Sequence, residues 1–231
     1  MRRLLSLSFA ALALGMAQPV MTQEERGVPM IKAPFHLPVF HNEYVTLLNV
    51  NVLPGRNTGY HIHSFDQVSV NIGAADMTNQ NLGSNEVSKP QRGESGRATF
   101  TDYVKGGTRT HKATNVGPTP FHNISTLFTG RPSGIVPAPR GGAYKQEIDN
   151  EKVRAWRLIL EPGQSAPAIT QNAPGLRIVV KGGEFTEMVP GQPDRMMGPS
   201  AGDFFWQDPG VTRTIRNTGT TPIDLVEFEI K

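Results

Sequence analysis

GYHIHSFDQVSVNIG, residues 59–73, carries two histidines two positions apart on a predicted strand. Because residues i and i+2 of a strand point to the same face, His61 and His63 should project side by side. Gln67 should share that face if the strand continues without a bulge. A third histidine, His111, lies on the predicted strand TRTHKATN further along the chain. Three neutral imidazoles that converge from two strands favour a site for a divalent first-row transition metal, with positions left open for substrate or oxygen.

The composition limits which other ligands such a site can use. The chain has 231 residues and no cysteine, which excludes disulfide bonds and thiolate ligands. A metal site must therefore use histidine, carboxylate, amide or water. The alternative is that the histidines only decorate a strand, as a lone H-x-H often does. With a net charge of +3 and 19% charged residues, there is no reason to expect a nucleic-acid-binding face.

An internal repeat bears on the choice between these two interpretations. NEYVTLLNVNVLPG, residues 42–55, aligns without gaps on NEKVRAWRLILEPG, residues 150–163, and NVGPTP aligns on NTGTTP further on. The offset is 108 residues in the first match and 102 in the second, so two copies of one unit are the simplest explanation. The second copy has no matching histidine: Arg213 aligns with His111, and QSAPAITQNAPG replaces the H-x-H. Histidines kept as a set in one copy and absent as a set from the other behave as a functional unit.

Each copy is predicted to consist of β strands. The 24 glycines and 19 prolines suit many short strands joined by tight turns better than long helices. Beyond the aligned segments, strands are predicted at Gln67–Ile72, Ala98–Val104, Asn123–Phe128, Leu176–Val180, Asp203–Trp206, Thr212–Arg216 and Ile223–Ile230. The predicted fold class is all-β, with two consecutive barrels or sandwiches.

The chain divides into five segments on this interpretation. They are a leader at residues 1–17, an extended arm at 18–40, a first barrel with the metal site at 41–129, a linker rich in proline and glycine at 130–145, and a second barrel without metal ligands at 146–231.

The leader, MRRLLSLSFAALALGMA, has the layout of a secretory signal peptide. Two arginines precede a short apolar run and small residues, and cleavage is expected after Ala17. A transmembrane anchor is the alternative, but the run is well short of the roughly 20 apolar residues that a spanning helix needs. Removing residues 1–17 removes two arginines and no acid, which lowers the net charge from +3 to +1. We expect a periplasmic or secreted protein with no stable membrane insertion after cleavage.

At these residues the chain resembles the cupin superfamily, and specifically a two-domain bicupin. The first cupin motif runs glycine, five residues, H-x-H, three or four residues, glutamate, six residues, glycine. Gly55, His61, His63 and Gln67 follow that spacing, while Gly73 comes one residue early. The resemblance extends over about residues 40–229.

The second cupin motif ends with histidine, three residues and asparagine, and His111 and Asn115 follow it. Gly106-Gly107 stands where the motif has proline-x-glycine, without the proline. In the second copy Arg213 and Asn217 keep the spacing but lose the ligand. The resemblance implies two jelly-roll barrels with a metal site only in the N-terminal one, held by His61, His63, His111 and the residue at position 67.

Gln67 departs from the motif, because it stands where a cupin has glutamate. An amide oxygen is a neutral and weaker donor than a carboxylate, so the bound ion keeps its full double charge. Such a centre should favour an anionic ligand such as an enolate, a carboxylate or hydroxide, although weaker metal retention in a degraded site is equally consistent. Asp66 is the other nearby acid, but alternation places it on the opposite face. We expect Gln67 to be a ligand or to orient one.

The leading functional hypothesis is an exported, metal-dependent bicupin oxidoreductase, of the dioxygenase type, acting on a small enolisable or phenolic compound. It would bind one divalent transition metal ion per chain, with Fe(II) favoured and Mn, Ni, Co, Cu or Zn also compatible with the ligands. A non-catalytic protein that binds a small sugar or carboxylate is the runner-up, and a metal-dependent isomerase or lyase is third. The expected partner is a small molecule, with a homodimer left open.

Other conspicuous side chains receive plainer interpretations. His36 and His41 could cap the barrel mouth but are better explained as exposed. Phe204, Phe205 and Trp206 should fill the core of the second barrel together with Trp156. Asn115 and Asn217 are turn residues rather than catalysts.

Overall fold

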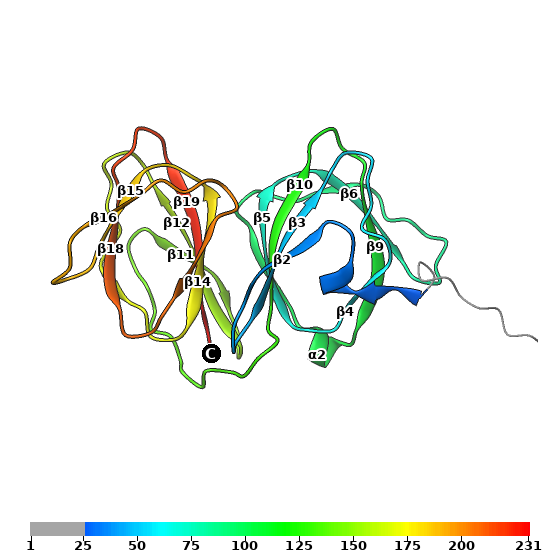
Figure 1. Cartoon of the computed structure of the whole chain (residues 1–231), viewed down its shortest axis with the longest axis horizontal. Coiled ribbons are helices and arrows are strands. Elements are labelled where there is room, and N and C mark those ends of the chain that lie inside the picture. The colour runs from blue at the N-terminus through cyan, green and yellow to red at the C-terminus, as the bar shows by residue number, and fades with distance from the viewer. Residues whose placement is uncertain (1–25) are drawn as a thin grey trace, which may run out of the picture.

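The computed structural model describes residues 26–231, and they form two β-barrels side by side (Figure 1). The predicted signal peptide, residues 1–17, lies outside the described residues. Each barrel is made of two facing sheets, so the predicted all-β class with two domains is confirmed. Within residues 26–231 no helix is long and apolar enough to cross a membrane.

The first barrel contains two five-stranded sheets. In strand order, one sheet is β1 (Val28–Pro29), β4 (His61–His63), β9 (Arg109–Asn115), β6 (Asp76–Asn81) and β7 (Gln91–Arg92), and the other is β2 (His36–His41), β3 (Thr46–Val52), β10 (Phe121–Leu127), β5 (Gln67–Gly73) and β8 (Ala98–Thr101). Neighbours in a sheet are distant in sequence, as in a jelly roll. Two short helices are added, η1 (Met30–Lys32) and α2 (Tyr103–Gly106).

The second barrel repeats this plan with one strand fewer. Its sheets are β11 (Tyr144–Asp149), β12 (Val153–Leu160), β19 (Ile223–Ile230), β14 (Gly175–Lys181) and β17 (Phe204–Gln207), and β13 (Ile169–Thr170), β18 (Thr212–Asn217), β15 (Phe185–Met188) and β16 (Arg195–Met197). The predicted strands at 176–180, 212–216 and 223–230 are therefore confirmed.

Two predicted segments differ from the structure. The strand predicted at Ala98–Val104 ends at Thr101, because the Asp102 side chain accepts a hydrogen bond from the backbone N–H of Lys105 and starts α2. The segment predicted as an extended arm up to residue 40 contributes β1 and β2, which are edge strands of the two sheets of the first barrel. β1 pairs with β4, so Val28 lies beside His61.

The repeat is visible in individual hydrogen bonds. Asn115 Nδ2 donates to the carbonyls of Val52 and Thr119 at 2.8 Å, and Asn217 Nδ2 donates to the equivalent carbonyls at 2.8 and 2.9 Å. Each side-chain oxygen accepts a bond from the backbone N–H two residues later, at 3.0 Å. Both asparagines are fully buried and tie a turn to the strand beside it, as expected of turn residues rather than catalysts.

The barrels are joined by a continuous apolar layer. Val68, Val70 and Ile72 of β5 pack in the same buried cluster as Leu176 and Ile178 of β14. Alternate residues of β5 face the interior of their own barrel, since successive side chains of a strand point to opposite faces.

The structure corrects one prediction about aromatic residues. Phe204 and Trp206 lie in the layer between the barrels rather than in the second barrel's core, and Trp206 stacks on Tyr44 with ring centroids 5.8 Å apart. Trp156 is in the second barrel's core as predicted, with Phe205 packed against that core. Alternation along β17 predicts that Phe205 faces the opposite side from Phe204 and Trp206. It does not predict that one side packs against the second barrel's core and the other against the first barrel.

Candidate metal centre

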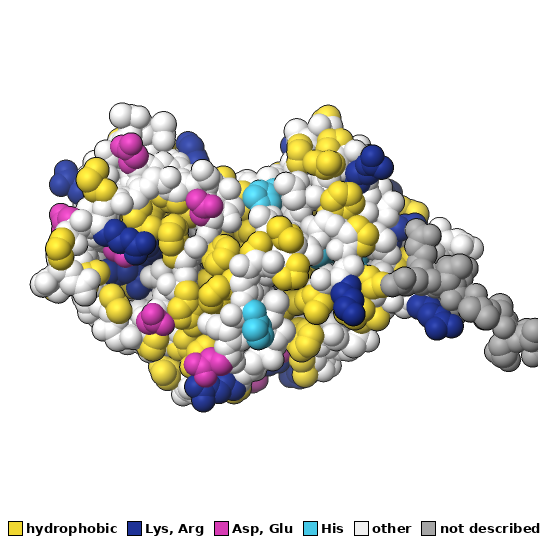
Figure 2. Space-filling model, in the orientation of Figure 1, with side chains coloured by type: hydrophobic (Ala, Val, Ile, Leu, Met, Phe, Trp, Pro, Cys, Tyr) yellow, Lys and Arg dark blue, Asp and Glu magenta, His cyan; other side chains and the backbone are white. Residues whose placement is uncertain are grey.

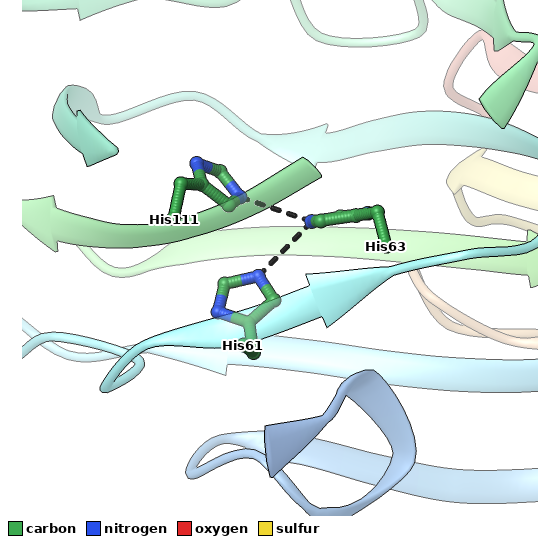
Figure 3. A group of neighbouring side chains, drawn as sticks. All are labelled: His61, His63 and His111. Atoms are coloured by element: carbon green, nitrogen blue, oxygen red, sulfur yellow. Dashed lines mark hydrogen bonds between the residues drawn. The ribbon is translucent and has the colours of Figure 1, made fainter. Parts of the chain in front are cut away.

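The three predicted ligands come together inside the first barrel. β4 and β9 are neighbouring antiparallel strands, and His61 lies directly opposite His111 in their ladder. His63 projects from the same face of β4, two residues later. Its Nε2 atom is 3.1 Å from Nε2 of His61 and 2.9 Å from Nε2 of His111 (Figure 3). All three side chains are buried, so the predicted convergence is confirmed.

The nitrogen separations from His63 suit a shared metal ion. Imidazole nitrogens bind such ions at about 2.0–2.1 Å, so two of them about 90° apart at the ion lie about 2.9 Å from each other. The separations of His63 Nε2 from the other two, 3.1 and 2.9 Å, are close to that value, and the three ligand atoms all lie within 4.8 Å of one another.

Hydrogen bonds on the outer side of two rings fix which nitrogen faces the triad. His61 Nδ1 donates to the carbonyl oxygen of Gly59, and His63 Nδ1 donates to the amide oxygen of Gln67, both at 3.1 Å. A carbonyl oxygen can only accept, so these neutral rings present Nε2 lone pairs to each other. A proton on His111 Nε2 would relieve only one of the two close contacts. A cation satisfies all three nitrogens, and the chemistry of the donor set therefore fits a metal.

The electrostatic environment keeps the three rings neutral. Burial is the main cause that lowers their pKa values, to about 3 for His61, about 4 for His63 and about 2 for His111. Repulsion from neighbouring histidines and from Arg109 contributes further in the same direction. At neutral pH the triad is in the unprotonated form that binds metal.

Gln67 reaches the site by a route that differs from the predicted one. The chain leaves β4 after His63 and enters β5 at Gln67, in the other sheet, so the two segments are not one continuous strand. The Gln67 amide oxygen accepts from His63 Nδ1, and its amide nitrogen donates to Ser69 Oγ at 2.9 Å. In this arrangement Gln67 orients His63.

His36 was expected to be exposed, and this was wrong. It is buried, and its ring centroid lies 4.8 Å from that of His61. Nδ1 donates to the carbonyl of Pro34 at 2.9 Å. Phe35, just before it, has a φ of 66°, the only positive φ of a residue other than glycine among those described. The other arm histidine, His41, is exposed.

Two further side chains define the surroundings of the triad. Tyr103 of α2 stacks on His63 with ring centroids 4.9 Å apart. Asp66 is buried but points elsewhere: it accepts from the backbone N–H of Val104 and forms an ion pair with Lys152 of the second barrel. Tyr103 could not be identified from the sequence, because its contact with His63 depends on where α2 packs.

The triad opens into a hollow of about 460 Å³. A polar wall is formed on β5, β8 and β10 by Gln67, Ser69, Asn71, Thr99, Thr101, Asn123 and Ser125. The apolar lining comes from both sheets and η1, with Met30, Val50, Val52, Met77, Ala113 and Phe121. Two arginines, Arg92 and Arg97, also line it, whereas no aspartate or glutamate is among the described lining residues.

The polar wall is a connected network. Asn123 Nδ2 donates to Asn71 Oδ1 at 2.9 Å, Ser125 Oγ donates to Asn123 Oδ1 at 2.8 Å, and Ser125 contacts Ser69 at 3.4 Å. Through Ser69 the network reaches Gln67 and so the triad. A satisfied network of this kind holds each side chain in place without any charge.

Several solved structures have a similar fold. AerE from Microcystis aeruginosa is similar with a TM-score of 0.57 and 10% identity, covering 86% of this chain and 98% of that one. Salicylate 1,2-dioxygenase from Pseudaminobacter salicylatoxidans has a TM-score of 0.57 and 12% identity, covering 84% and 76%. A variant of oxalate decarboxylase from B. subtilis has a TM-score of 0.56 and 12% identity, covering 81% and 69%.

No protein-family model matches the sequence, and no curated protein matches it either. At 10–12% identity the solved structures establish the fold alone. Two barrels of this topology, with the histidine triad of the described residues inside the N-terminal barrel, show that the chain has a bicupin fold.

Proposed function

We propose that this chain is an exported, metal-dependent oxidoreductase of the dioxygenase type, acting on a small enolisable or phenolic compound that binds as an anion. The observation that carries the proposal is a buried triad of neutral histidines at the end of a hollow lined by arginine but by no acidic side chain. Enzymes with such chemistry occur among the bicupins similar in fold, including a salicylate dioxygenase.

His61, His63 and His111 would hold the metal through their Nε2 atoms, with one ion per chain and Fe(II) favoured. The ion would supply a Lewis-acidic and redox-active centre for the substrate anion and oxygen. Gln67, through Nδ1 of His63, keeps that ring turned with Nε2 toward the other two histidines.

Charge explains the preference for an anion. The three imidazoles are neutral, and so is the Gln67 amide behind His63, so no ligand offsets the double charge of the ion. Arg92 and Arg97 add positive charge to the lining, although Arg92 is paired with Asp76 at 3.3 Å. The apolar part of the lining, with Val50 and Phe121, suits the hydrocarbon part of such a substrate.

Oxygen uptake tests the proposal. The iron-loaded chain is given candidate diketones, flavonols and hydroxyaromatic acids, and at least one should cause oxygen consumption with product formation. His111→Ala should abolish that activity, whereas His41→Ala, which removes an exposed histidine, should not affect it. Metal-loaded protein that consumes no oxygen with any of these classes would contradict the dioxygenase assignment.

A non-catalytic binding protein is the second candidate, and the polar wall favours it. Five connected amide and hydroxyl side chains, Gln67, Ser69, Asn71, Asn123 and Ser125, suit a hydroxyl-rich ligand such as a small sugar. Thermal shifts on adding sugars, without product, would support this function over oxidation.

Export is part of the proposal and rests on the leader sequence. Mature protein should begin near Gln18 and be recovered from the periplasm or the medium, which N-terminal sequencing checks. Intact residues 1–17 on cytoplasmic protein would contradict it.

A further inference from the structure

The interior of the second barrel carries charged residues where the first carries the triad. Ile169 pairs with Arg213 in the ladder of β13 and β18, as His61 pairs with His111 in β4 and β9. Gln171 follows Ile169 by two residues and so occupies the place of His63. Every candidate metal ligand on these strands is thus replaced, and one replacement is a cation.

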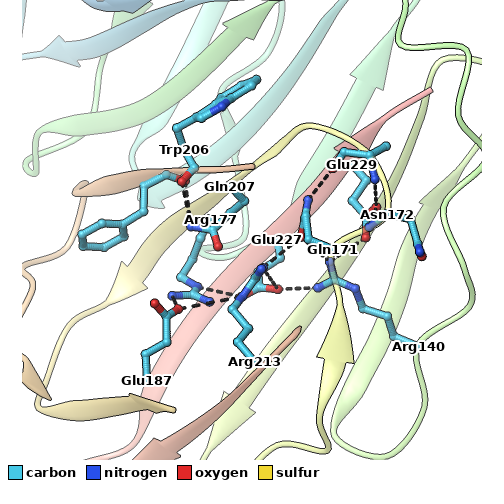
Figure 4. Close-up of polar contacts among 12 residues, drawn as sticks. Arg140, Gln171, Asn172, Arg177, Glu187, Trp206, Gln207, Arg213, Glu227 and Glu229 are labelled. Carbon is cyan, nitrogen blue, oxygen red and sulfur yellow. Dashed lines mark hydrogen bonds and ion pairs between the residues drawn. The ribbon is translucent and has the colours of Figure 1, made fainter. Parts of the chain in front are cut away.

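These residues belong to a buried ion cluster (Figure 4). Arg177 bonds to Glu227 at 2.6 Å and to Glu187 at 2.7 Å, and Arg213 reaches Glu227 at 3.4 Å. Arg140, which arrives from the linker between the barrels, pairs with Glu227 and with Glu229. Three arginines and three glutamates make the cluster neutral as a whole.

Three N–H groups of the cluster have no partner among the described residues: Nε of Arg140, Nη2 of Arg177 and Nε of Arg213. The side chains of Arg177 and Arg213 are only 1% and 2% exposed. The nearest acid to Arg213 Nε is Glu187, at 3.8 Å, beyond hydrogen-bond distance. An unpaired N–H of a buried cation is costly, because it has lost water without gaining an acceptor.

Both arginines line a hollow of about 390 Å³ in this barrel. Met197, Phe205 and Val211 give it apolar surface, and the exposed Arg195 adds a third cation. Basic side chains gather among apolar ones over the middle of this barrel in Figure 2. Glu187 and Asp208 also line the hollow, so its lining carries three cations and two anions.

We infer that this hollow binds a small monocarboxylate with an apolar body, whose carboxylate pairs with the arginines of the lining, Arg177, Arg195 and Arg213. The apolar body lies against Phe205 and Met197. Burial and repulsion from the other two arginines lower the pKa of Arg213, in keeping with a site that has room for one more anion. The inference is independent of the proposed function, since it involves neither metal nor reaction.

The two tryptophans of the chain provide a fluorescence probe close to this hollow. Trp156 and Trp206 both belong to the second barrel, and Trp206 lines the hollow. The metal-loaded chain is titrated with cyclohexanecarboxylate, which does not absorb at the exciting wavelength. A saturable change in tryptophan fluorescence is expected, and neutral cyclohexanecarboxamide should produce none.

Three variants distinguish carboxylate binding in this hollow from binding at the histidine triad. Arg213→Met should weaken carboxylate binding about 10-fold to 100-fold, because a charge-assisted hydrogen bond is lost. Arg195→Gln, at an exposed position that does not endanger folding, should weaken it about twofold to fivefold. His111→Ala should leave the titration unchanged. Equal binding of the carboxamide, full affinity in both arginine variants, or loss of the signal in His111→Ala would overturn the inference.

Discussion

The two barrels share a frame but differ in what that frame encloses. Ser69 faces Ser125 across β5 and β10 in the first barrel, and Arg177 faces Glu227 across β14 and β19 at the same ladder position of the second. The first pair is neutral, at 3.4 Å, and the second is a buried ion pair at 2.6 Å. The order of the equivalent strands and the asparagine turns are the same in both barrels, although the side chains inside them differ. The interior is therefore free to become either a neutral metal pocket or an ionic cluster.

The same comparison explains why the second barrel is unsuited to a metal. A guanidinium remains charged at any accessible pH and repels a cation. Gly175, which takes the place of Gln67, has no room for a side chain, because an added Cβ would lie 2.0 Å from the carbonyl oxygen of Phe228. Restoring the histidines alone would thus not restore the first barrel's surroundings.

Metal stoichiometry gives the sharpest contrast between the barrels. One ion per chain is expected, and His111→Ala should release most of it while the fold is retained, since a ligand in a hollow contributes little to the apolar core. Elemental analysis with circular dichroism measures both. Two ions per chain, or full retention in the double variant His61→Ala with His111→Ala, would remove the distinction between the barrels.

Replacing Glu227 or Ser125 by alanine should lower the free energy of unfolding by very different amounts. Glu227→Ala leaves three buried arginines short of a partner and should cost about 3–5 kcal/mol of unfolding free energy. Ser125→Ala at the equivalent position should cost about 1 kcal/mol or less. Urea unfolding of both variants tests this, with Glu227→Gln as a control that keeps the shape but removes the charge. Similar losses for Glu227→Ala and Ser125→Ala would show that the ionic interior does not differ energetically from the neutral one.

The triad should make the metal-free chain sensitive to acid. In the unfolded chain histidines titrate near pH 6.5, whereas burial lowers the folded pKa values to about 3 for His61 and about 4 for His63. Below pH 6.5 the unfolded chain therefore binds protons that the folded chain does not, and stability falls as the pH falls toward 4.

Urea unfolding at pH 7.5 and pH 5.0 measures this difference. It should be smaller in His111→Gln, because one of the buried histidines is gone. An unchanged difference would assign the acid sensitivity to groups outside the triad.

Gln67→Glu should produce the smallest of these effects. The added carboxylate offsets part of the ion's charge, so metal should bind about tenfold more tightly and anionic ligands more weakly. Competition with a chelator and anion titrations measure the two affinities, and Asn71→Asp serves as a matched control further along β5. If both affinities stay unchanged, Gln67 acts only on the orientation of His63.

Much of this arrangement follows from local patterns in the sequence. The H-x-H spacing and the repeat were sufficient to predict two barrels and the convergence of His61, His63 and His111. The position of His36 was not predictable in the same way, because Pro38 and a register shift between Pro38 and Phe40 hide the alternation of β2. The ion cluster also escaped prediction, since its members come from strands far apart in the sequence and pair only after folding.

The layer between the barrels has a consequence for the hollow itself. A single barrel is ordinarily held together by the apolar side chains that fill it, and a barrel with a water-accessible, amide-rich interior gives up much of that cohesion. Here β5 turns Ser69 and Asn71 inward while Val68 and Val70 are buried against the neighbouring barrel. The wall of the pocket is therefore stabilised by the neighbouring barrel, and the repeat that lacks the histidine triad supports the one whose interior remains open.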